Sequence, residues 1–335
     1  MQLIVQFLTA IFSAFVLVNS HEIAWAQSTD AFYKNRNFTY IISAGAGGGY
    51  DVYGRLTAEF MQKHLPGSTF VVKNMPGAGH LIGGNALYAS AADGFTIGTF
   101  SPSLIYNQLS KSTGVRYDLT KMSWIGKAGT DPRVIMIAAQ VPIHSYNDFK
   151  MYPGKLNFSA SGLGSASYVE MMLLMKTIGL PIRVLTGYAG SSDQLAMRRG
   201  EIAGTIGSRS SVQQFVDNGF GRLIAQIGGS DKETPHLSDF ALSDEARKSV
   251  ALIQSQSDMS RLTAGPPGIP ADKLLILIDA YRKAMNDPAL QDRAIKLGYP
   301  VEPAFGDEVR KIVETALRQS DETILLLKET LTEAK

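Results

Sequence analysis

The chain has 335 residues, of which 45% are hydrophobic and 19% are charged, an ordinary globular composition that excludes global disorder. The formal net charge is only +2 and the basic residues are scattered, so we expect no nucleic-acid partner. Cysteine is absent, which excludes disulfides, thiolate metal sites and cysteine nucleophiles.

The N-terminus has the features of an export signal. An apolar run extends from Leu3 to Val18, and Ala24-Trp25-Ala26 matches the small-x-small pattern of a signal-peptidase site. At about 16 residues the run is shorter than the ~20 that span a bilayer, which favours cleavage over anchoring. We therefore expect residues 1–26 to be a signal peptide, residues 27–37 a leader, and the protein to lie in the periplasm. No Lys or Arg precedes Lys34, so an uncleaved anchor or a different start codon stays open.

Strand and helix patterns then alternate along a first unit. The expected strands are 37–42, 70–72 and 96–100, and the expected helices are 51–64 and 79–92. This alternation predicts a parallel sheet with helices on both faces.

A second unit of the same kind begins near residue 134. Its expected strands are 134–139, 156–160, 182–185, 202–206 and 223–227, with helices at 168–177 and 194–199. From residue 271 onward the apolar spacing is helical only, and we expect this tail to pack on the first unit.

Two Gly- and Pro-containing segments, 124–133 and 257–270, are the expected hinge. They divide the chain into a first lobe of residues 38–133 plus 259–335 and a second lobe of residues 134–258. The predicted fold class is α/β, with two doubly wound lobes that two crossings allow to close on a ligand.

The glycine cluster at 45–49 lies between a strand and a helix, where free backbone N–H groups and the helix dipole favour an anion. As a dinucleotide fingerprint it fails, because Tyr50 replaces the third glycine and the next strand ends in Lys73-Asn74 without a ribose-binding acid. A plain turn is the alternative. Asp51 stands at the helix start, where capping is favoured over ligand contact.

Similar turns follow other strands. Gly77, Ala78 and Gly79 form a second glycine turn, which either binds an anion or simply turns the chain. The stretch containing Ser161, Gly164 and Ser165 adds hydroxyls that suit a carboxylate or cap a helix.

Further candidates lie after three other strands. Tyr188 and Gly190 form a less specific turn, and Ser101 follows the strand at 96–100. Arg209 follows the strand at 202–206 and either grips a second carboxylate or is an exposed surface side chain.

Hydrolase and metal signatures are missing from the sequence. It contains no G-x-S-x-G, S-x-x-K or H-E-x-x-H, and its five histidines have no ligand-like spacing. We therefore expect no catalysis, no metal and no cofactor. His80, beside Gly79, is the histidine that merits attention.

Two segments together resemble the periplasmic solute-binding receptors of tripartite tricarboxylate transporters, the Bug or TctC-like proteins. Gly-Gly-Gly-Tyr-Asp at 47–51 with Val-Tyr-Gly-Arg-Leu at 52–56 is similar to the family's GGxxD-x-x-x-R-L stretch. Residues 71–79, followed by Gly83, Ala86 and residues 93–96, match equally well, and the similarity extends from about residue 38 into the C-terminal helices.

This resemblance implies a type II periplasmic binding protein fold, with a ligand carboxylate held by the glycine loop through backbone groups and water. That role falls here on Gly47, Gly48, Gly49 and Asp51, with Ser161, Gly164 and Ser165 opposing them from the second lobe.

The chain departs from the family pattern at three places. Gly45-Ala46 replaces a proline-containing lead-in, and Ile206-Gly207 replaces a frequent Phe-Asp pair. An aromatic residue common at the return hinge is absent around Ser260 and Arg261. With Arg209 nearby, we expect a carboxylate with a second acidic or an aromatic end.

The resulting hypothesis is a monomeric receptor that captures a di- or tricarboxylate or an aromatic acid and delivers it to a membrane permease. A sensory module with the same closure, or a nucleotide-using α/β enzyme, are the alternatives.

Overall fold

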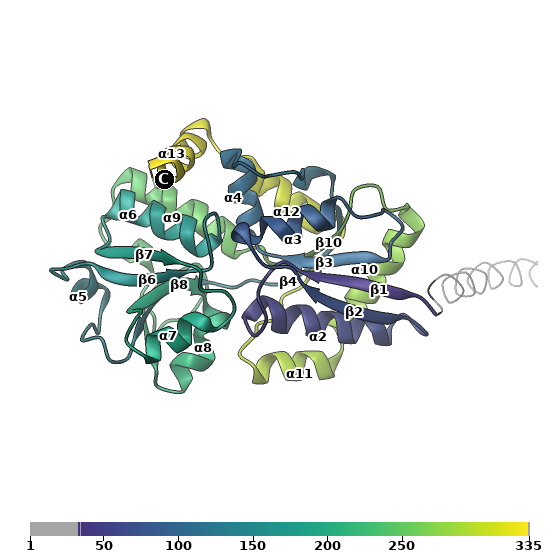
Figure 1. Ribbon diagram of the computed structural model, residues 1–335, viewed down its shortest axis with the longest axis horizontal. Helices are drawn as coiled ribbons and strands as arrows, with labels where there is room; N and C mark the ends of the chain where they lie inside the picture. Colours follow the sequence, from purple (N-terminus) through teal and green to yellow (C-terminus); the bar gives the residue numbers. More distant parts are fainter. Residues whose placement is uncertain (1–32, 34, 334–335) are drawn as a thin grey trace, which may run out of the picture.

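The computed structural model describes residue 33 and residues 35–333, and it has two lobes that lie side by side (Figure 1). Each lobe is a β-sheet covered by helices on both faces. The expected signal peptide, and all of the leader before Tyr33, lie outside the described residues. None of the described helices has the length and apolar character needed to span a membrane.

The first lobe contains a six-stranded sheet in the order β11-β4-β10-β3-β1-β2. Its strands are β1 (Asn37–Ile42), β2 (Thr69–Asn74), β3 (Thr96–Phe100), β4 (Ser123–Gly129), β10 (Ser260–Gly265) and β11 (Ala304–Phe305). One face carries α2 (Gly49–Lys63), α10 (Ala271–Met285) and α11 (Pro288–Lys296), and the other carries α3 (Leu81–Tyr88), α4 (Ser103–Ser110) and α12 (Asp307–Leu317).

The second lobe contains a five-stranded sheet in the order β7-β6-β8-β5-β9. Its strands are β5 (Arg133–Ala138), β6 (Leu156–Ala160), β7 (Ile182–Thr186), β8 (Gly204–Ser208) and β9 (Gly221–Ile227). Its helices are α5 (Tyr146–Lys150), α6 (Ala166–Ile178), α7 (Ser192–Arg198), α8 (Arg209–Asp217) and α9 (Asp244–Ser257). Short 3₁₀ turns occupy η1 (Ala78–His80), η2 (Leu119–Lys121) and η3 (Leu237–Asp239).

Both sheets are mixed rather than parallel throughout, which corrects the expectation from the sequence. The strand–helix–strand units are parallel, with β1 between β2 and β3 in one lobe and β6 between β7 and β8 in the other. The strands next to a lobe crossing are antiparallel to their neighbours, namely β10 to β3 and β4, and β5 to β8 and β9. The chain leaves the first lobe along β4 and returns to it along the neighbouring β10, so these two strands run in opposite directions.

The hinge is shorter than the sequence indicated, because β4 and β10 occupy most of the two predicted hinge segments. The chain crosses between the sheets at 130–132 and 258–259. The glycines in β4 serve packing rather than flexibility: a Cβ on Gly126 would lie 2.2 Å from the Tyr281 ring, and one on Gly129 would lie 2.6 Å from the Pro300 carbonyl oxygen.

The C-terminal helices also divide between the lobes. As expected, α10 and α12 pack on the first sheet, but α13 (Asp321–Glu333) packs against α4 of the first lobe and against α6 and α9 of the second. Its Leu326 and Leu327 belong to an apolar core that runs through both lobes on this side. The tail therefore makes a third connection between the lobes.

Candidate ligand-binding site

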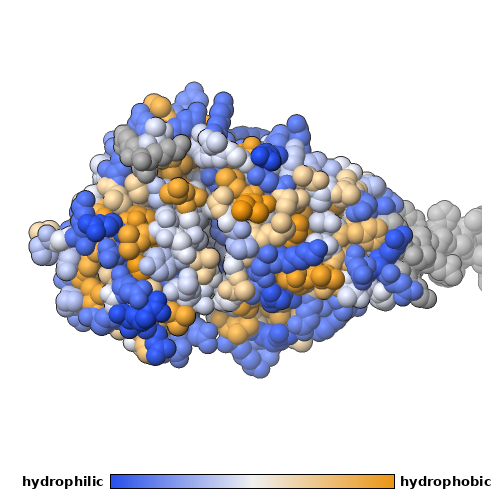
Figure 2. Space-filling model, in the orientation of Figure 1, coloured by the Kyte–Doolittle hydropathy of each residue, from blue (hydrophilic) through white to orange (hydrophobic). Residues whose placement is uncertain are grey.

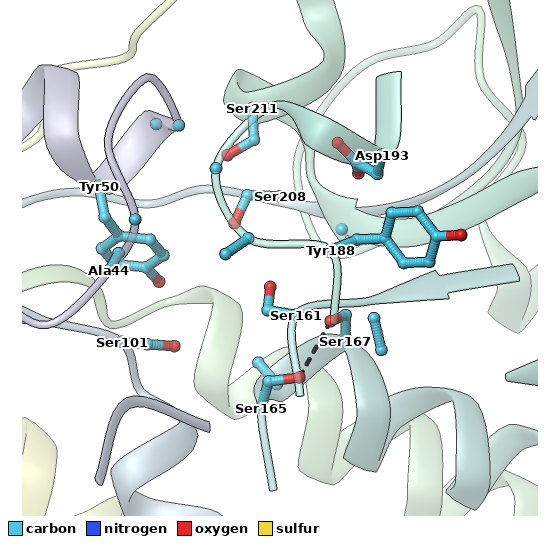
Figure 3. Close-up of a pocket in the computed structure, with 18 of the residues that line it drawn as sticks. Ala44, Tyr50, Ser101, Ser161, Ser165, Ser167, Tyr188, Asp193, Ser208 and Ser211 are labelled. Atoms are coloured by element: carbon cyan, nitrogen blue, oxygen red, sulfur yellow. Dashed lines mark hydrogen bonds between the residues drawn. The ribbon is translucent and has the colours of Figure 1, made fainter. Parts of the chain in front are cut away.

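A pocket of about 140 Å³ lies between the lobes, where loops after the strands of the two sheets meet. Figure 2 shows residues of intermediate hydropathy along the seam between the lobes. The first lobe contributes the glycine loop, the 76–80 turn and Ser101, and the second contributes the loops after β6, β7 and β8. Hydroxyl groups dominate the view in Figure 3, where Ser101, Ser161, Ser165, Ser208 and Ser211 surround the pocket.

The glycine loop leads into the N-terminus of α2, as the sequence indicated. Gly48 is the residue before the helix, and Gly49 and Tyr50 line the pocket at its first positions. Asp51 faces the loop itself: its carboxylate accepts the Gly47 N–H at 3.0 Å. Although burial raises the pKa of Asp51, hydrogen bonds from Gly47, Arg55 and Asn74 outweigh it and hold the pKa below its usual value. Asp51 therefore fixes the conformation of the glycine loop.

The lobes touch each other around the pocket, so the structure is closed. Asn107 of α4 donates to the Gly164 carbonyl oxygen across the cleft at 3.0 Å. A Cβ added to Gly190 would lie 2.3 Å from the Ala46 carbonyl oxygen, and one added to Gly79 would lie 2.5 Å from the backbone of residues 163–165. Glycine is required at these contacts because the two backbones approach directly.

The turn at 76–80 contributes Gly77, Gly79 and His80 to the pocket, whereas Ala78 is exposed outside it. His80 has a φ of 77° and lies with Nδ1 2.7 Å from the Ser43 carbonyl oxygen. Nδ1 therefore donates, which leaves Nε2 as an acceptor. Burial lowers the pKa of His80 to about 4, so its imidazole is neutral at physiological pH.

The second lobe presents the N-terminus of α6 to the same pocket. Ser165 caps the helix by accepting the Tyr168 N–H at 3.3 Å, and its hydroxyl lies 3.2 Å from that of Ser167. Residues 165–167 all line the pocket. The pocket therefore lies between two helix N-termini, one from each lobe.

An arginine lines the pocket, but it is Arg133 rather than Arg209. Arg133 binds Glu170 through Nε at 2.8 Å and Nη2 at 2.6 Å, and its Nη1 donates to Ser208 at 2.7 Å. Its charge is thus balanced by a buried carboxylate. Arg209 forms an ion pair with Asp231 at 2.5 Å and lines a separate groove beside the 298–302 loop.

Arg261 lies in β10, next to the 258–259 crossing, where the family resemblance suggested a missing aromatic. Its side chain is 1% exposed, and its guanidinium lies 4.0 Å from the centre of the Tyr50 ring. It pairs with Asp131 at 2.7 Å, and Asp131 also accepts the backbone N–H of Ser210 at the start of α8 at 3.1 Å. Arg261 therefore packs on the Tyr50 ring of the first lobe. Through Asp131, which binds Ser210, it also contacts the second lobe.

Asp193, in the first turn of α7, is an acid in the pocket that the sequence reasoning did not single out. Its Oδ1 accepts the Gln194 N–H at 2.8 Å. Burial raises the pKa of Asp193 to about 6, against the opposing effect of hydrogen bonds from nearby backbone groups and Ser159. Tyr188 lines the same side, with its hydroxyl directed away from Tyr50 in Figure 3.

The predicted site residues divide into two groups. Those that line the pocket are Gly48, Gly49, Tyr50, Gly77, Gly79, Ser101, Ser161, Ser165, Tyr188 and Gly190. Those outside it are Gly47, Asp51, Ala78, Gly164 and Arg209. His80, the histidine singled out from the sequence, also lines the pocket. Lining residues that we did not predict include Arg133, Asp193, Thr205, Ser208 and Ser211. The available signal was position along the chain: Ser208 ends β8, Ser211 and Asp193 lie in the first turns of the helices that follow β8 and β7, and Arg133 begins β5 at the hinge. Thr205, inside β8, had no such signal.

Comparison with known proteins agrees with this architecture. The family described as "Tripartite tricarboxylate transporter family receptor" matches residues 54–326. The protein BugT of Bordetella pertussis is 30% identical over 212 residues, which cover 60% of this chain and 63% of BugT.

Two solved structures share the fold. The periplasmic binding protein BugD has a TM-score of 0.75 at 19% identity, covering 89% of this chain and 98% of BugD. MatC from Rhodopseudomonas palustris, with bound malate, has a TM-score of 0.71 at 19% identity, covering 88% of this chain and 99% of MatC. Because the family match spans most of the chain, the protein belongs to the tripartite tricarboxylate transporter receptor family.

Proposed function

We propose that this protein is an exported receptor that captures a small carboxylate between its lobes and delivers it to a membrane permease. The observation that carries the proposal is the convergence of two helix N-termini, from α2 and α6, on one closed pocket. N-terminal N–H groups lack intrahelical partners and lie at the positive end of the helix dipole. A carboxylate between them is therefore stabilised by both lobes at once.

Contact with both lobes is what couples binding to closure. A ligand shifts a conformational equilibrium only by its difference in affinity for the two states. In the open state a carboxylate at α2 would lack the groups from α6, so it favours the closed state. Because the ligand-bound receptor then differs in shape from the empty receptor, a permease can recognise the bound form.

The pocket volume restricts the ligand to a small molecule. Engineered protein cavities of about 150 Å³ hold benzene, and this pocket has a similar volume. We propose that the receptor performs no covalent chemistry and uses no cofactor. Malate in MatC, a relative with the same fold, supports the carboxylate assignment.

A thermal-shift screen of the purified protein tests this function, with alkanoates, amino-carboxylates, di- and tricarboxylates, aromatic acids and nucleotides as ligands. Binding to the folded state raises the melting temperature by mass action, by several degrees for a ligand at about 100 times its Kd. A rise with at least one class of small carboxylate is expected. A rise with nucleotides alone, or with none of these ligands, would overturn the proposal.

A further inference from the structure

Asp193 is half-buried and, unlike the buried acids near the cleft, has no cationic partner among the described residues. Asp51 pairs with Arg55, Asp131 with Arg261, and Glu170 with Arg133. No Lys, Arg or His in the part of the chain that the structure describes forms an ion pair with Asp193. Its side chain nevertheless lines the closed pocket, on the side away from Tyr50 and Ser101 in Figure 3.

An ionised carboxylate in a site closed from water is costly unless a cation or hydrogen-bond donors compensate it. The upward shift of the Asp193 pKa has burial as its largest cause, and no neighbouring charge contributes to it. At neutral pH a carboxyl group with a pKa of about 6 is still mostly ionised. Hydrogen bonds to Asp193 compensate its burial only in part, and no described cationic side chain pairs with its negative charge.

Another part of the same pocket favours a negatively charged group of the ligand. The N-termini of α2 and α6 attract an anion, while the positive charge of Arg133 is already balanced by Glu170. The pocket is thus bipolar: helix dipoles favour a carboxylate at one part of the lining, and Asp193 disfavours a second carboxylate at another.

We propose that Asp193 receives an ammonium group of the ligand, so that the receptor takes a small amino-carboxylate in preference to a dicarboxylate. This inference rests on the proposed capture of a carboxylate and narrows its class. It also revises the second acidic end that the sequence suggested, because the arginine behind that expectation, Arg209, lies outside the pocket.

Isothermal titration with three matched ligand series tests the proposal. The amino series is glycine, 3-aminopropanoate, 4-aminobutyrate and 5-aminopentanoate, because the required spacing between the two charged groups is unknown. The isosteric alkanoates replace the ammonium with a methyl group, and malonate, succinate, glutarate and adipate replace it with a carboxylate. We expect one amino-carboxylate to bind at least about tenfold more tightly than its alkanoate and its dicarboxylate counterparts.

Two variants locate the effect. Asp193→Asn is expected to weaken the preferred amino-carboxylate by at least about tenfold, to leave the alkanoate within about threefold, and to tighten the dicarboxylate. Asp217→Asn, which makes the same charge change on the exposed end of α8, should leave all three affinities unchanged. Circular dichroism and the melting temperature of each variant verify the fold.

The possible outcomes are distinct. If carboxylates bind but Asp193→Asn leaves their ranking unchanged, Asp193 is not a ligand-selecting residue and the inference fails while the receptor function stands. If no carboxylate binds to the native protein, the receptor function itself fails. A role of Asp193 only in stabilising the α7 dipole predicts a lower melting temperature in Asp193→Asn with an unchanged ligand ranking.

Discussion

At the scale of single residues, burial acts in opposite directions on two titratable side chains of the pocket. Removal from water disfavours the charged form of any group, so it lowers the pKa of His80 to about 4 and raises that of Asp193 to about 6. At neutral pH the pocket therefore presents a neutral imidazole and an ionised carboxylate. Of these two groups, only Asp193 carries a charge with which a ligand can interact at neutral pH.

Ligand affinity should depend on pH with opposite signs for two ligand classes. Above pH 6 the Asp193 carboxylate is ionised and attracts an ammonium group. As the pH falls through about 6 it becomes protonated, so affinity for an amino-carboxylate falls and affinity for a dicarboxylate rises. Titrations of the preferred amino-carboxylate and of its dicarboxylate counterpart from about pH 5 to about pH 8 measure both slopes.

A control must distinguish titration of Asp193 from titration of the other charged groups near the pocket. They are His80 and the Arg133–Glu170 pair in and below the pocket, Arg198 and the Arg199–Glu201 pair at the far end of α7, and the Arg209–Asp231 pair beside α8. In Asp193→Asn the amino-carboxylate slope should disappear between pH 5 and pH 7, and the dicarboxylate slope should fall to that of the ligand's own second ionisation. A larger slope in this variant would assign the titration to one of these other protein groups.

Among elements, the sequence located the strands and helices that carry the site better than it located the hinge. The strands β1, β3 and β6 have the predicted bounds, and α2 and α6 begin within two residues of their predicted starts. Their patterns are local: a β-branched or aromatic run, a glycine or serine turn, then a helical repeat. By contrast, β4 and β10 contain Gly, Ser and Arg, whose burial depends on partners more than a hundred residues away in sequence.

Closure depends on the loop between β7 and α7 fitting against the glycine loop. Gly190→Ala places a Cβ 2.3 Å from the Ala46 carbonyl oxygen, so we expect the lobes to close incompletely and ligand affinity to fall by at least about tenfold. Small-angle scattering with saturating ligand should show less compaction than in the native protein.

Gly200→Ala is the matched control for Gly190→Ala. Gly200 also has a positive φ, 78° against 67°, but no atom lies within 4 Å of the position that its added methyl group would take. Both variants should lose similar stability from backbone strain, about 1 kcal/mol. Equal loss of ligand affinity in the two variants would show that strain, rather than the contact with Ala46, is responsible.

At the scale of the whole molecule, the lobes are joined by more than their two chain crossings. Arg261 and Asp131 form a buried pair in the hinge that also holds the start of α8, and α13 packs on helices of both lobes. The apolar core on the α13 side continues through both lobes. We therefore expect the lobes to rotate about the α13 side of the molecule when they close, so that the loops on the two sides of the pocket approach each other.

Removal of the charge from Asp131 should destabilise the protein strongly. Asp131→Asn leaves the Arg261 guanidinium buried without a counterion, and arginine does not lose its proton in proteins. We expect a loss of about 3 kcal/mol in the free energy of unfolding, measured by urea denaturation. The nearby Tyr50 ring compensates only in part.

Asp244→Asn provides the comparison, because Asp244 pairs with Arg247 on the exposed surface of α9. Its effect should be within about 1 kcal/mol, the range for exposed ion pairs. If Asp131→Asn unfolds at the same urea concentration as the native protein, the hinge pair does not stabilise the closed fold.

The sequence by itself determined the α/β class, the two lobes, and the glycine and serine turns that begin the site, because strand periodicity, helix starts and turn residues are properties of adjacent positions. Only the tertiary structure decided which side chains meet in the pocket. It placed Arg133 there and Arg209 outside, paired Arg261 with Asp131, and left Asp193 without a cation among the described residues. Burial and charge pairing depend on residues brought together from distant strands, so no local pattern could have fixed them.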